Sequence, residues 1–107
     1  MQLWNLVLSG YPGAGKTGLA RRLISENPQF VRLNVDDLRS MYFGAGQPPR
    51  NEESVYNTII TLRDLILRSR RSVVIDSTAP RNSTRDLLLN TKVQGVTEIE
   101  AGPSRNV

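Results

Sequence analysis

Cysteine and histidine are both absent from this chain of 107 residues. Without cysteine there are no disulfides, no thiol chemistry and no cysteine-ligated zinc, and without histidine there is no imidazole to act as a general base or metal ligand. Acid–base chemistry must therefore use carboxylates, lysine or tyrosine. A bound metal must be held by oxygen, which is the preference of Mg²⁺ and similar hard ions.

Long hydrophobic runs are also missing. The unbroken apolar stretches, such as Val73 to Ile75, are a few residues long, whereas a membrane-spanning helix needs roughly 20. The apolar residues 4–8 are interrupted by Asn5 and are not followed by a longer apolar segment, so we expect neither a membrane span nor a signal peptide. A chain without cysteine or a signal is expected in the cytoplasm.

The charge is dominated by arginine. The net charge is +4, carried by twelve arginines and two lysines against ten acidic residues. Arginine makes bidentate contacts with phosphate, so this balance suits a phosphate-rich partner. From charge alone, a solvated basic surface is an equally good interpretation.

Strand and helix patterns alternate along the chain. Strands are predicted at residues 3–9, 30–35, 72–76 and 96–100, and helices at 16–26, 36–42, 51–71 and from Ser83 or Thr84 to about Lys92. This alternation predicts an α/β fold with a mainly parallel sheet. The hydrophobic fraction of 38% suits one domain with one core, which we place at residues 1–100, followed by a flexible tail at 101–107.

Local signals predict how the helices begin, end and pack. Asp36 and Asn51 are the expected N-caps of the second and third helices, and a loop is expected at 43–50, where two glycines and two prolines occur. A turn is expected at Pro80. The third helix carries apolar residues at helical spacing, which predicts a buried stripe of Val55, Ile59, Leu62 and Ile66.

The segment GYPGAGKT, residues 10–17, fills every fixed position of the pattern G-x-x-x-x-G-K-[ST] between a predicted strand and a predicted helix. Glycines let successive backbone N–H groups point into one concavity at a helix N-terminus, where phosphate is attracted. The alternative is a glycine-rich turn before an ordinary helix. The candidate nucleotide-binding residues are Gly10, Gly13, Ala14, Gly15, Lys16 and Thr17.

Two of these residues have further predicted roles. Lys16 can reach the outer phosphates of ATP, and the Thr17 hydroxyl can bind Mg²⁺.

Asp76 follows three apolar residues at the end of a predicted strand, with Thr78 close by, and is the candidate second metal ligand, acting directly or through water. The alternative is that Asp76 caps the turn toward Pro80.

A third constellation is LNVDDLRSMYFG, residues 33–44, in which two aspartates follow a strand. If Asp36 begins a helix, Asp36 and Arg39 share a face. Asp36 could accept a proton from an acceptor hydroxyl that attacks a γ-phosphate, and Arg39 could hold a phosphate of the acceptor. From spacing alone it is equally plausible that Asp36 caps the helix and pairs with Arg39 in solvent.

Together, GYPGAGKT, NVDDLR and VVIDST resemble the polynucleotide 5′-hydroxyl kinase-like group of P-loop kinases, to which zeta-toxin-like kinases are related, over residues 3–90. Two positions depart from the pattern of the group. Val35 stands where it often has arginine, and Ala79 stands where it typically has asparagine.

The resemblance implies a three-layer P-loop NTPase fold with helices on both faces of a sheet of strand order 2-3-1-4, without the lid and fifth strand of related kinases. It implies Asp36 as general base, with Asp37 as the alternative, Arg39 as a contact to acceptor phosphate, and Asp76 at the strand-end position of the family. Arg81 and Arg85, which could replace a lid arginine, are expected to be solvated surface residues.

The function that we expect is transfer of the γ-phosphate of Mg²⁺·ATP to a hydroxyl of a nucleic-acid end, a nucleoside or a nucleotide sugar. Other readings are a nucleotide-binding module without catalysis, an NTPase that drives a partner, and a site completed by a second copy of the chain. No membrane partner is expected, and the oligomeric state stays open.

Overall fold

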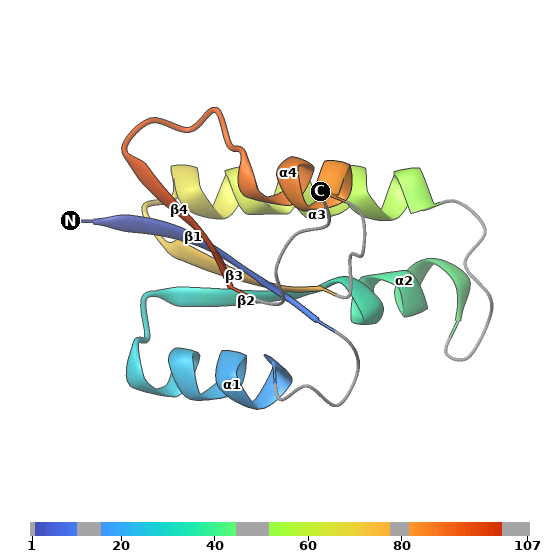
Figure 1. Cartoon of the computed structure of the whole chain (residues 1–107), viewed down its shortest axis with the longest axis horizontal. Coiled ribbons are helices and arrows are strands. Elements are labelled where there is room, and N and C mark those ends of the chain that lie inside the picture. The colour runs from blue at the N-terminus through green and yellow to red at the C-terminus, as the bar shows by residue number, and fades with distance from the viewer. Residues whose placement is uncertain (1, 11–15, 45–51, 78–81, 102–107) are drawn as a thin grey trace.

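The computed structural model of the chain describes residues 2–10, 16–44, 52–77 and 82–101 (Figure 1). Within these residues, four strands and four helices follow the order β1 Leu3–Ser9, α1 Lys16–Glu26, β2 Phe30–Asn34, α2 Val35–Phe43, α3 Glu52–Arg68, β3 Ser72–Ser77, α4 Asn82–Leu89 and β4 Val96–Ala101. All strand pairs are parallel and the strand order is β2-β3-β1-β4. The predicted α/β fold class and strand order are confirmed.

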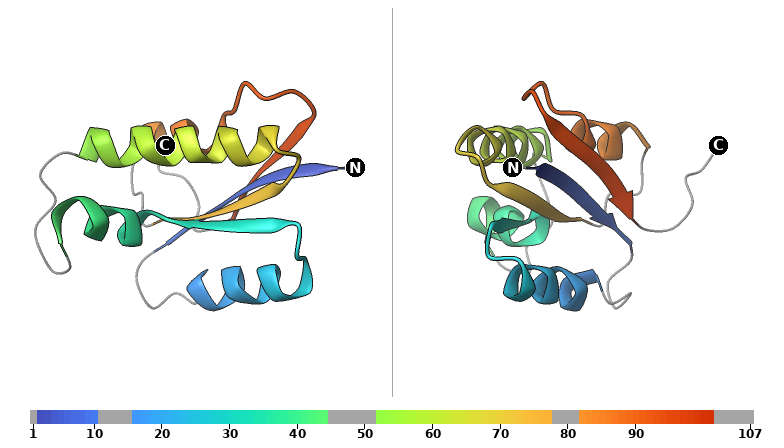
Figure 2. Two further views of the ribbon diagram at one scale, coloured as in Figure 1. Left: turned by 180° about the vertical axis from the view of Figure 1, so that it is seen from behind. Right: turned by 90° about the vertical axis from the view of Figure 1, so that its left-hand side faces the viewer.

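The sheet is the middle of three layers, with α1 on one face and α3 and α4 on the opposite face (Figures 1 and 2). Side chains alternate between the two faces along each strand. Val7, Val73 and Ile75 pack in the core toward α3 and α4, whereas Leu8 and Val74 pack in a second cluster with Ala20 of α1. Because β3 has both faces covered, all six of its residues are buried.

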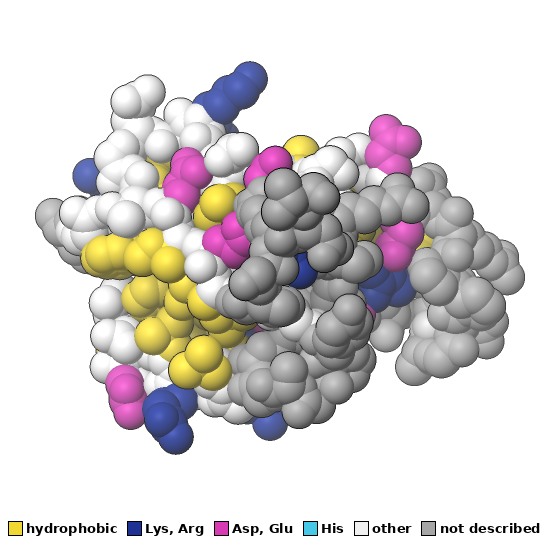
Figure 3. All heavy atoms as spheres, viewed as in Figure 1, with side chains coloured by type: hydrophobic (Ala, Val, Ile, Leu, Met, Phe, Trp, Pro, Cys, Tyr) yellow, Lys and Arg dark blue, Asp and Glu magenta, His cyan; other side chains and the backbone are white. Residues whose placement is uncertain are grey.

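The face that carries α1 is covered incompletely. On β4, the alternation that turns Val96 toward α4 turns Ile99 toward the α1 side, where its side chain is 41% exposed. Leu19 of α1 is 50% exposed, and Figure 3 shows hydrophobic side chains gathered in this part of the surface.

The boundary between β2 and α2 differs from its prediction. The strand ends at Asn34 and Val35 begins the helix. The N-cap is Asn34, not Asp36: its Oδ1 accepts a hydrogen bond of 2.7 Å from the backbone N–H of Asp37. Val35 is 1% exposed and packs in the α3-side core with Leu38. Val35, one of the two residues that depart from the kinase pattern, is therefore a core residue.

The buried stripe of α3 is also different in its second half. Val55 and Ile59 are buried as predicted, but the stripe continues through Arg63 and Leu67 instead of Leu62 and Ile66. Both sets of residues have helical spacing, so spacing alone does not distinguish them. Arginine is rarely expected in a core, because a buried charge needs specific partners.

Arg63 finds these partners at the end of α4. Its Nη1 donates to the carbonyl oxygens of Leu87 and Leu88 over 2.8 and 3.0 Å, and its Nε donates to Oδ1 of Asp64 over 2.8 Å. Thr91 also donates from Oγ1 to this Asp64 oxygen. Arg63 thus satisfies carbonyl groups that a helix leaves without partners in its last turn.

The ends of α4, α2 and β4 also differ from prediction. Ser83 and Thr84 lie inside α4 rather than capping it, and α4 ends at Leu89 instead of Lys92. Phe43 belongs to α2, whose C-cap is Gly44 at φ 87°, a conformation that favours glycine. Ala101 belongs to β4 rather than to the tail.

The third helix ends in a Schellman motif. The backbone N–H of Arg71 donates to the Ile66 carbonyl and that of Arg70 to the Leu67 carbonyl, while Arg70 adopts φ 68°. Left-handed backbone at this position is usual for glycine and unfavourable for arginine.

Several predictions lie outside the described residues: the loop at 45–50, the cap at Asn51, Thr78, Ala79, the turn at Pro80, Arg81 and the tail at 102–107. Across residues 2–10, 16–44, 52–77 and 82–101, no helix is both long and apolar enough to cross a membrane.

Candidate active site at the carboxyl edge of the sheet

The candidate site lies where the parallel strands end. Asp76 of β3 is in register with Leu8 of β1 on one side and with Asn34 of β2 on the other. The helix α1 returns from β1 toward β2, while β4 lies on the other side of β1. In open α/β sheets, ligands bind outside the carboxyl ends of the strands at such a change of direction.

The glycine-rich segment begins at this edge. Gly10 follows β1 with φ 156°, a backbone conformation that other residues rarely adopt. Lys16 and Thr17 open α1, so the backbone N-terminus of this helix follows the loop as a phosphate site requires. Gly13, Ala14 and Gly15, and the side chains of Lys16 and Thr17, lie outside the described part of the chain.

Asp76 is held on the α1 side of the sheet by two donors from β2. Its Oδ2 accepts hydrogen bonds of 3.1 Å from Nη2 of Arg32 and 3.1 Å from Nδ2 of Asn34. The Asp76 side chain is 0% exposed. One side chain, Asn34, therefore caps α2 with its oxygen and orients Asp76 with its nitrogen.

The Asp76 carboxylate is chemically suited to bind a magnesium ion. Carboxylate oxygen is a preferred Mg²⁺ ligand, and Mg²⁺ in phosphate sites is usually held by one or two carboxylates together with phosphates and water. No group of three or more acidic, histidine or cysteine side chains within the described ranges could hold a metal by itself. A magnesium ion at Asp76 would therefore need further ligands, such as the Thr17 hydroxyl, nucleotide phosphates or water.

Asp36 and Arg39 do share a face of α2, as their spacing predicts. Nη1 of Arg39 contacts Oδ1 of Asp36. The same guanidinium binds Glu52 of α3, from Nε to both carboxylate oxygens over 3.1 Å and from Nη2 to Oε1 over 2.9 Å. The hydrogen bond to Glu52 is the largest cause that raises the pKa of Arg39 above its ordinary value.

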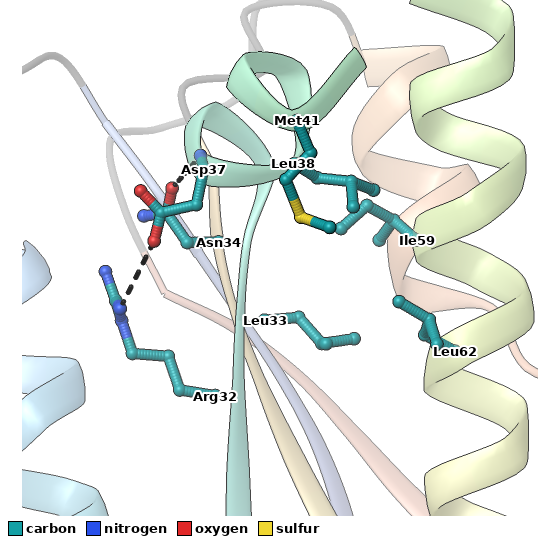
Figure 4. Close-up of a pocket in the computed structure, with 8 residues that line it drawn as sticks. All are labelled: Arg32, Leu33, Asn34, Asp37, Leu38, Met41, Ile59 and Leu62. Atoms are coloured by element: carbon teal, nitrogen blue, oxygen red, sulfur yellow. Dashed lines mark hydrogen bonds and ion pairs between the residues drawn. The ribbon is translucent and has the colours of Figure 1, made fainter. Parts of the chain in front are cut away.

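The neighbouring Asp37 has different surroundings. Its side chain is 78% exposed, and its carboxylate lies 3.9 Å from Nη1 of Arg32. Figure 4 shows Arg32 and Asp37 on one side of β2. Together with Asn34, they line one pocket with the apolar residues on the other side of this strand, Leu33, Leu38, Met41, Ile59 and Leu62. Asp36 thus lies with Arg39 and Glu52, whereas Asp37 lies toward Arg32.

A tyrosine extends the site from α3 to the end of β3. Tyr56 lies one helical turn after Glu52. Burial is the largest cause that raises the pKa of Tyr56 above its ordinary value, while the side chain of Ser77 at the end of β3 acts to lower this pKa. The phenol therefore stays protonated at neutral pH and can donate.

Sequence reasoning missed Arg32, Asn34, Glu52, Tyr56 and Ser77. Asn34 could have been found, because asparagine before two aspartates is a strong N-cap signal. Arg32 could then have been placed on the same strand face as Asn34. Nothing local points to Glu52, because its partner lies on another helix.

Arg85 was expected in solvent, but it is 6% exposed and lies 3.7 Å from Glu100, so that prediction is wrong.

A glycine-rich loop between β1 and α1, in a parallel sheet of order β2-β3-β1-β4, defines a P-loop NTPase domain. The chain belongs to the AAA domain family, which matches residues 6–97. No sequence among curated proteins matches it.

Two solved structures show the same arrangement. One, described as "Structure of Pnkp1/Rnl/Hen1 complex", is 36% identical over 80% of this chain with a TM-score of 0.67. The other, "Structure of the Pnkp1/Rnl/Hen1 RNA repair complex", is 32% identical over 81% of this chain with a TM-score of 0.68. The matches confirm the predicted resemblance to polynucleotide 5′-hydroxyl kinase-like P-loop kinases. This chain covers 29% of the length of each matched chain.

Proposed function

We propose that this chain is a kinase domain that binds Mg²⁺·ATP at residues 10–17 and phosphorylates the 5′-hydroxyl of a nucleic-acid end. The observation that carries the proposal is the Asp36–Arg39 pair at the edge where the glycine-rich loop begins. A carboxylate beside a cation, at the same edge of the sheet as the candidate phosphate-binding segment, could supply the base and the anion contact that phosphoryl transfer to a hydroxyl needs.

In the proposed reaction, the acceptor oxygen attacks the γ-phosphorus, the bond from this phosphorus to the bridging oxygen of ADP breaks, and Asp36 takes the proton of the acceptor. Mg²⁺, held by Thr17 and Asp76, would neutralise charge that develops on the phosphates. Lys16 contacts the outer phosphates. Arg39 binds a phosphate of the acceptor through N–H groups that Asp36 and Glu52 do not use.

We favour Asp36 over Asp37 as the base. Asp36 lies against the cation that would hold the acceptor, whereas Asp37 is more exposed, at 78%, and lies toward Arg32. The nucleic-acid acceptor is supported by the two matched structures, one of which is described as an RNA repair complex, and by the arginine-rich composition. A nucleoside or a nucleotide sugar is the alternative acceptor.

The test is transfer of label from γ-labelled ATP, with Mg²⁺, to 5′-hydroxyl DNA, 5′-hydroxyl RNA, nucleosides and nucleotide sugars. The variants are Lys16→Ala, Asp36→Asn and, as a matched control, Asp37→Asn. We expect labelled 5′ ends with the parent chain, and a loss of about 10²-fold to 10⁴-fold with Asp36→Asn, which is the usual contribution of a general base. Asp37→Asn should stay within a few-fold of the parent.

Other outcomes would identify other functions. Label on a small acceptor only would replace the nucleic-acid assignment, and loss in Asp37→Asn alone would exchange the two aspartates. If nothing is labelled but ATP raises the melting temperature of the parent and not of Lys16→Ala, the chain is a nucleotide-binding module without transfer.

A further inference from the structure

Glu52 makes the most extensive contact with a candidate catalytic side chain among the described residues. Both of its carboxylate oxygens lie 3.1 Å from Nε of Arg39, and Oε1 is 2.9 Å from Nη2. The next residue, Glu53, has the same charge in the same first turn of α3 and is exposed. Only one of the two glutamates therefore reaches across to α2.

The contact occupies one edge of the guanidinium and leaves another available. Arginine has five N–H groups in a fixed plane. Glu52 takes Nε and one hydrogen of Nη2, and Asp36 takes one hydrogen of Nη1. Within the described contacts, one hydrogen remains on each terminal nitrogen. Both terminal nitrogens therefore keep an N–H group that can donate to a phosphate oxygen.

Glu52 is not needed to hold α2 against α3. Leu38 of α2 packs in the same core cluster as Val55 and Ile59 of α3. The hydroxyl groups of Tyr42 and Thr58 add a hydrogen bond of 2.6 Å between the two helices. Because the pair with Arg39 is partly exposed, with 18% and 42% of the two side chains accessible, its contribution to stability is small.

The net charge of the group formed by Asp36, Arg39 and Glu52 makes two possible roles of Glu52 distinguishable. They predict opposite changes in acceptor binding when Glu52 is removed. Two carboxylates surround one guanidinium, so the group as a whole is negative and repels a phosphate at long range. If Glu52 merely neutralised Arg39, its removal would tighten acceptor binding. If Glu52 holds the plane of the guanidinium in place, its removal would weaken acceptor binding, because a mobile arginine must be ordered on each binding event.

We propose that Glu52 is a positioning residue, which fixes the Arg39 fork so that its two remaining N–H groups meet a phosphate of the acceptor. The inference rests on the proposed function and extends it to a residue on a different helix. It also assigns the acceptor class: a substrate with a phosphate next to the reacting nucleotide should benefit from Glu52, and a nucleoside without phosphate should not.

The experiment compares Glu52→Gln with the matched control Glu53→Gln, and Glu52→Asp as the conservative variant. Steady-state transfer is measured with two acceptors, a nucleoside 3′-monophosphate and the same nucleoside without phosphate. For Glu52→Gln we expect the KM of the phosphorylated acceptor to rise about tenfold, the scale of a hydrogen bond to a charged group, while the KM of ATP is unchanged. Glu52→Asp should recover part of the loss, and Glu53→Gln should match the parent.

Two results would overturn the inference. One is a KM for the phosphorylated acceptor that is unchanged or lower in Glu52→Gln. The other is an equal loss with both acceptors, which would indicate a structural role. A double-mutant cycle with Arg39→Ala sharpens the test. Once Arg39 is absent, adding Glu52→Gln should weaken acceptor binding little further, because the two residues act as a unit.

A failure of the proposed function can be recognised separately. If the parent transfers no phosphate, binding of nucleoside 3′-monophosphate is measured by isothermal titration calorimetry. Binding that weakens about tenfold in Glu52→Gln and not in Glu53→Gln would sustain the role of Glu52 without the reaction. Equal binding in both variants, or no binding by the parent, would reject it.

Discussion

Two arginines on adjacent helices illustrate two uses of one side chain. Arg63 is 4% exposed and donates to the carbonyl oxygens of Leu87 and Leu88 and to Asp64. Arg39 is 18% exposed, and its described partners, Asp36 and Glu52, are carboxylates. Backbone carbonyls are fixed by the helix that carries them, whereas carboxylates belong to side chains that can rotate. Arg63 therefore makes its described contacts within the fold, whereas Arg39, held by Glu52, keeps N–H groups that a phosphate can contact.

The difference also explains what each arginine does for folding. A buried guanidinium is stabilising only when all its surroundings are polar and well placed, and its partners are left unsatisfied if it is removed. A partly exposed ion pair is screened and contributes little. We therefore expect stability to depend on Arg63 and the proposed transfer to depend on Arg39.

The strongest test of this comparison replaces each arginine with methionine. Arg63→Met should lose about 3–5 kcal/mol of unfolding free energy, because the Leu87 carbonyl loses its side-chain donor and Asp64 loses its cationic partner, while Asn5 still donates to Leu88. Arg39→Met should lose about 0–1 kcal/mol, but it should abolish the selective binding of phosphate-bearing acceptors. Urea unfolding gives both values. If Arg63→Met does not fold, Arg63→Lys, which retains a charge and some donors, should show an intermediate loss.

Equal losses of stability in the two variants would contradict the expectation that stability depends on Arg63 more than on Arg39. So would an Arg63 variant that folds normally and transfers no phosphate.

A smaller effect is expected from acid. Partial burial would raise the pKa of Asp64, but hydrogen bonds from Arg63 and Thr91 outweigh it and hold the pKa below its usual value of 3.8. A lowered pKa contributes stability that is present above the unfolded value and is lost as pH falls through the folded one. Below about pH 4, the unfolding free energy of Asp64→Asn should therefore fall less steeply than that of the parent.

The control for this measurement is Glu53→Gln, which removes an exposed carboxylate from the same helix. Its unfolding free energy should follow the parent at each pH. A slope for Asp64→Asn as steep as that of the parent would mean that the Arg63 network does not depend on the Asp64 charge.

The smallest effect is expected at a third arginine of this region, where the backbone matters more than the side chain. Arg70 adopts φ 68° at the end of α3. Arg70→Gly should raise the unfolding free energy by about 0.5–1 kcal/mol, because glycine avoids the left-handed strain. Arg70→Ala is the matched control and should gain nothing, since alanine has the same strain. A gain in both variants would place the effect in the lost charge instead.

The sequence predicted the fold through features that are local and repeated. The alternation of strands and helices, with the apolar runs of residues 3–9 and 72–76, indicated a parallel α/β sheet, and the resemblance supplied its strand order. Boundaries were less accurate because neighbouring residues compete for the same role. Asn34 and Asp36 are both good N-caps, and the choice depends on Val35, whose side chain is drawn into the core.

Contacts between residues of the candidate site were predicted only where the residues are close in sequence. Asp36 and Arg39 are three residues apart on one helix, so their contact followed from helical spacing. Glu52 and Arg32 act through contacts with other elements, which sequence spacing does not record. Arg63 was missed for a related reason: a hydrophobic pattern predicts apolar residues in the core, and the carbonyl groups that make a buried arginine acceptable become visible only once α4 is in place.

The order of the strands has a consequence for how the chain folds. Of the four described strands, β1 is synthesised first, yet its neighbours in the sheet begin far later: Asn5 pairs with Val73 and Leu3 pairs with Val96. Even the nearest pairing, between Phe30 and Ser72, spans α2 and α3. Sheets built from such distant pairings fold slowly. During synthesis, the apolar β1 therefore has no strand partner until β3 has left the ribosome, and in that period its unpaired edges favour aggregation.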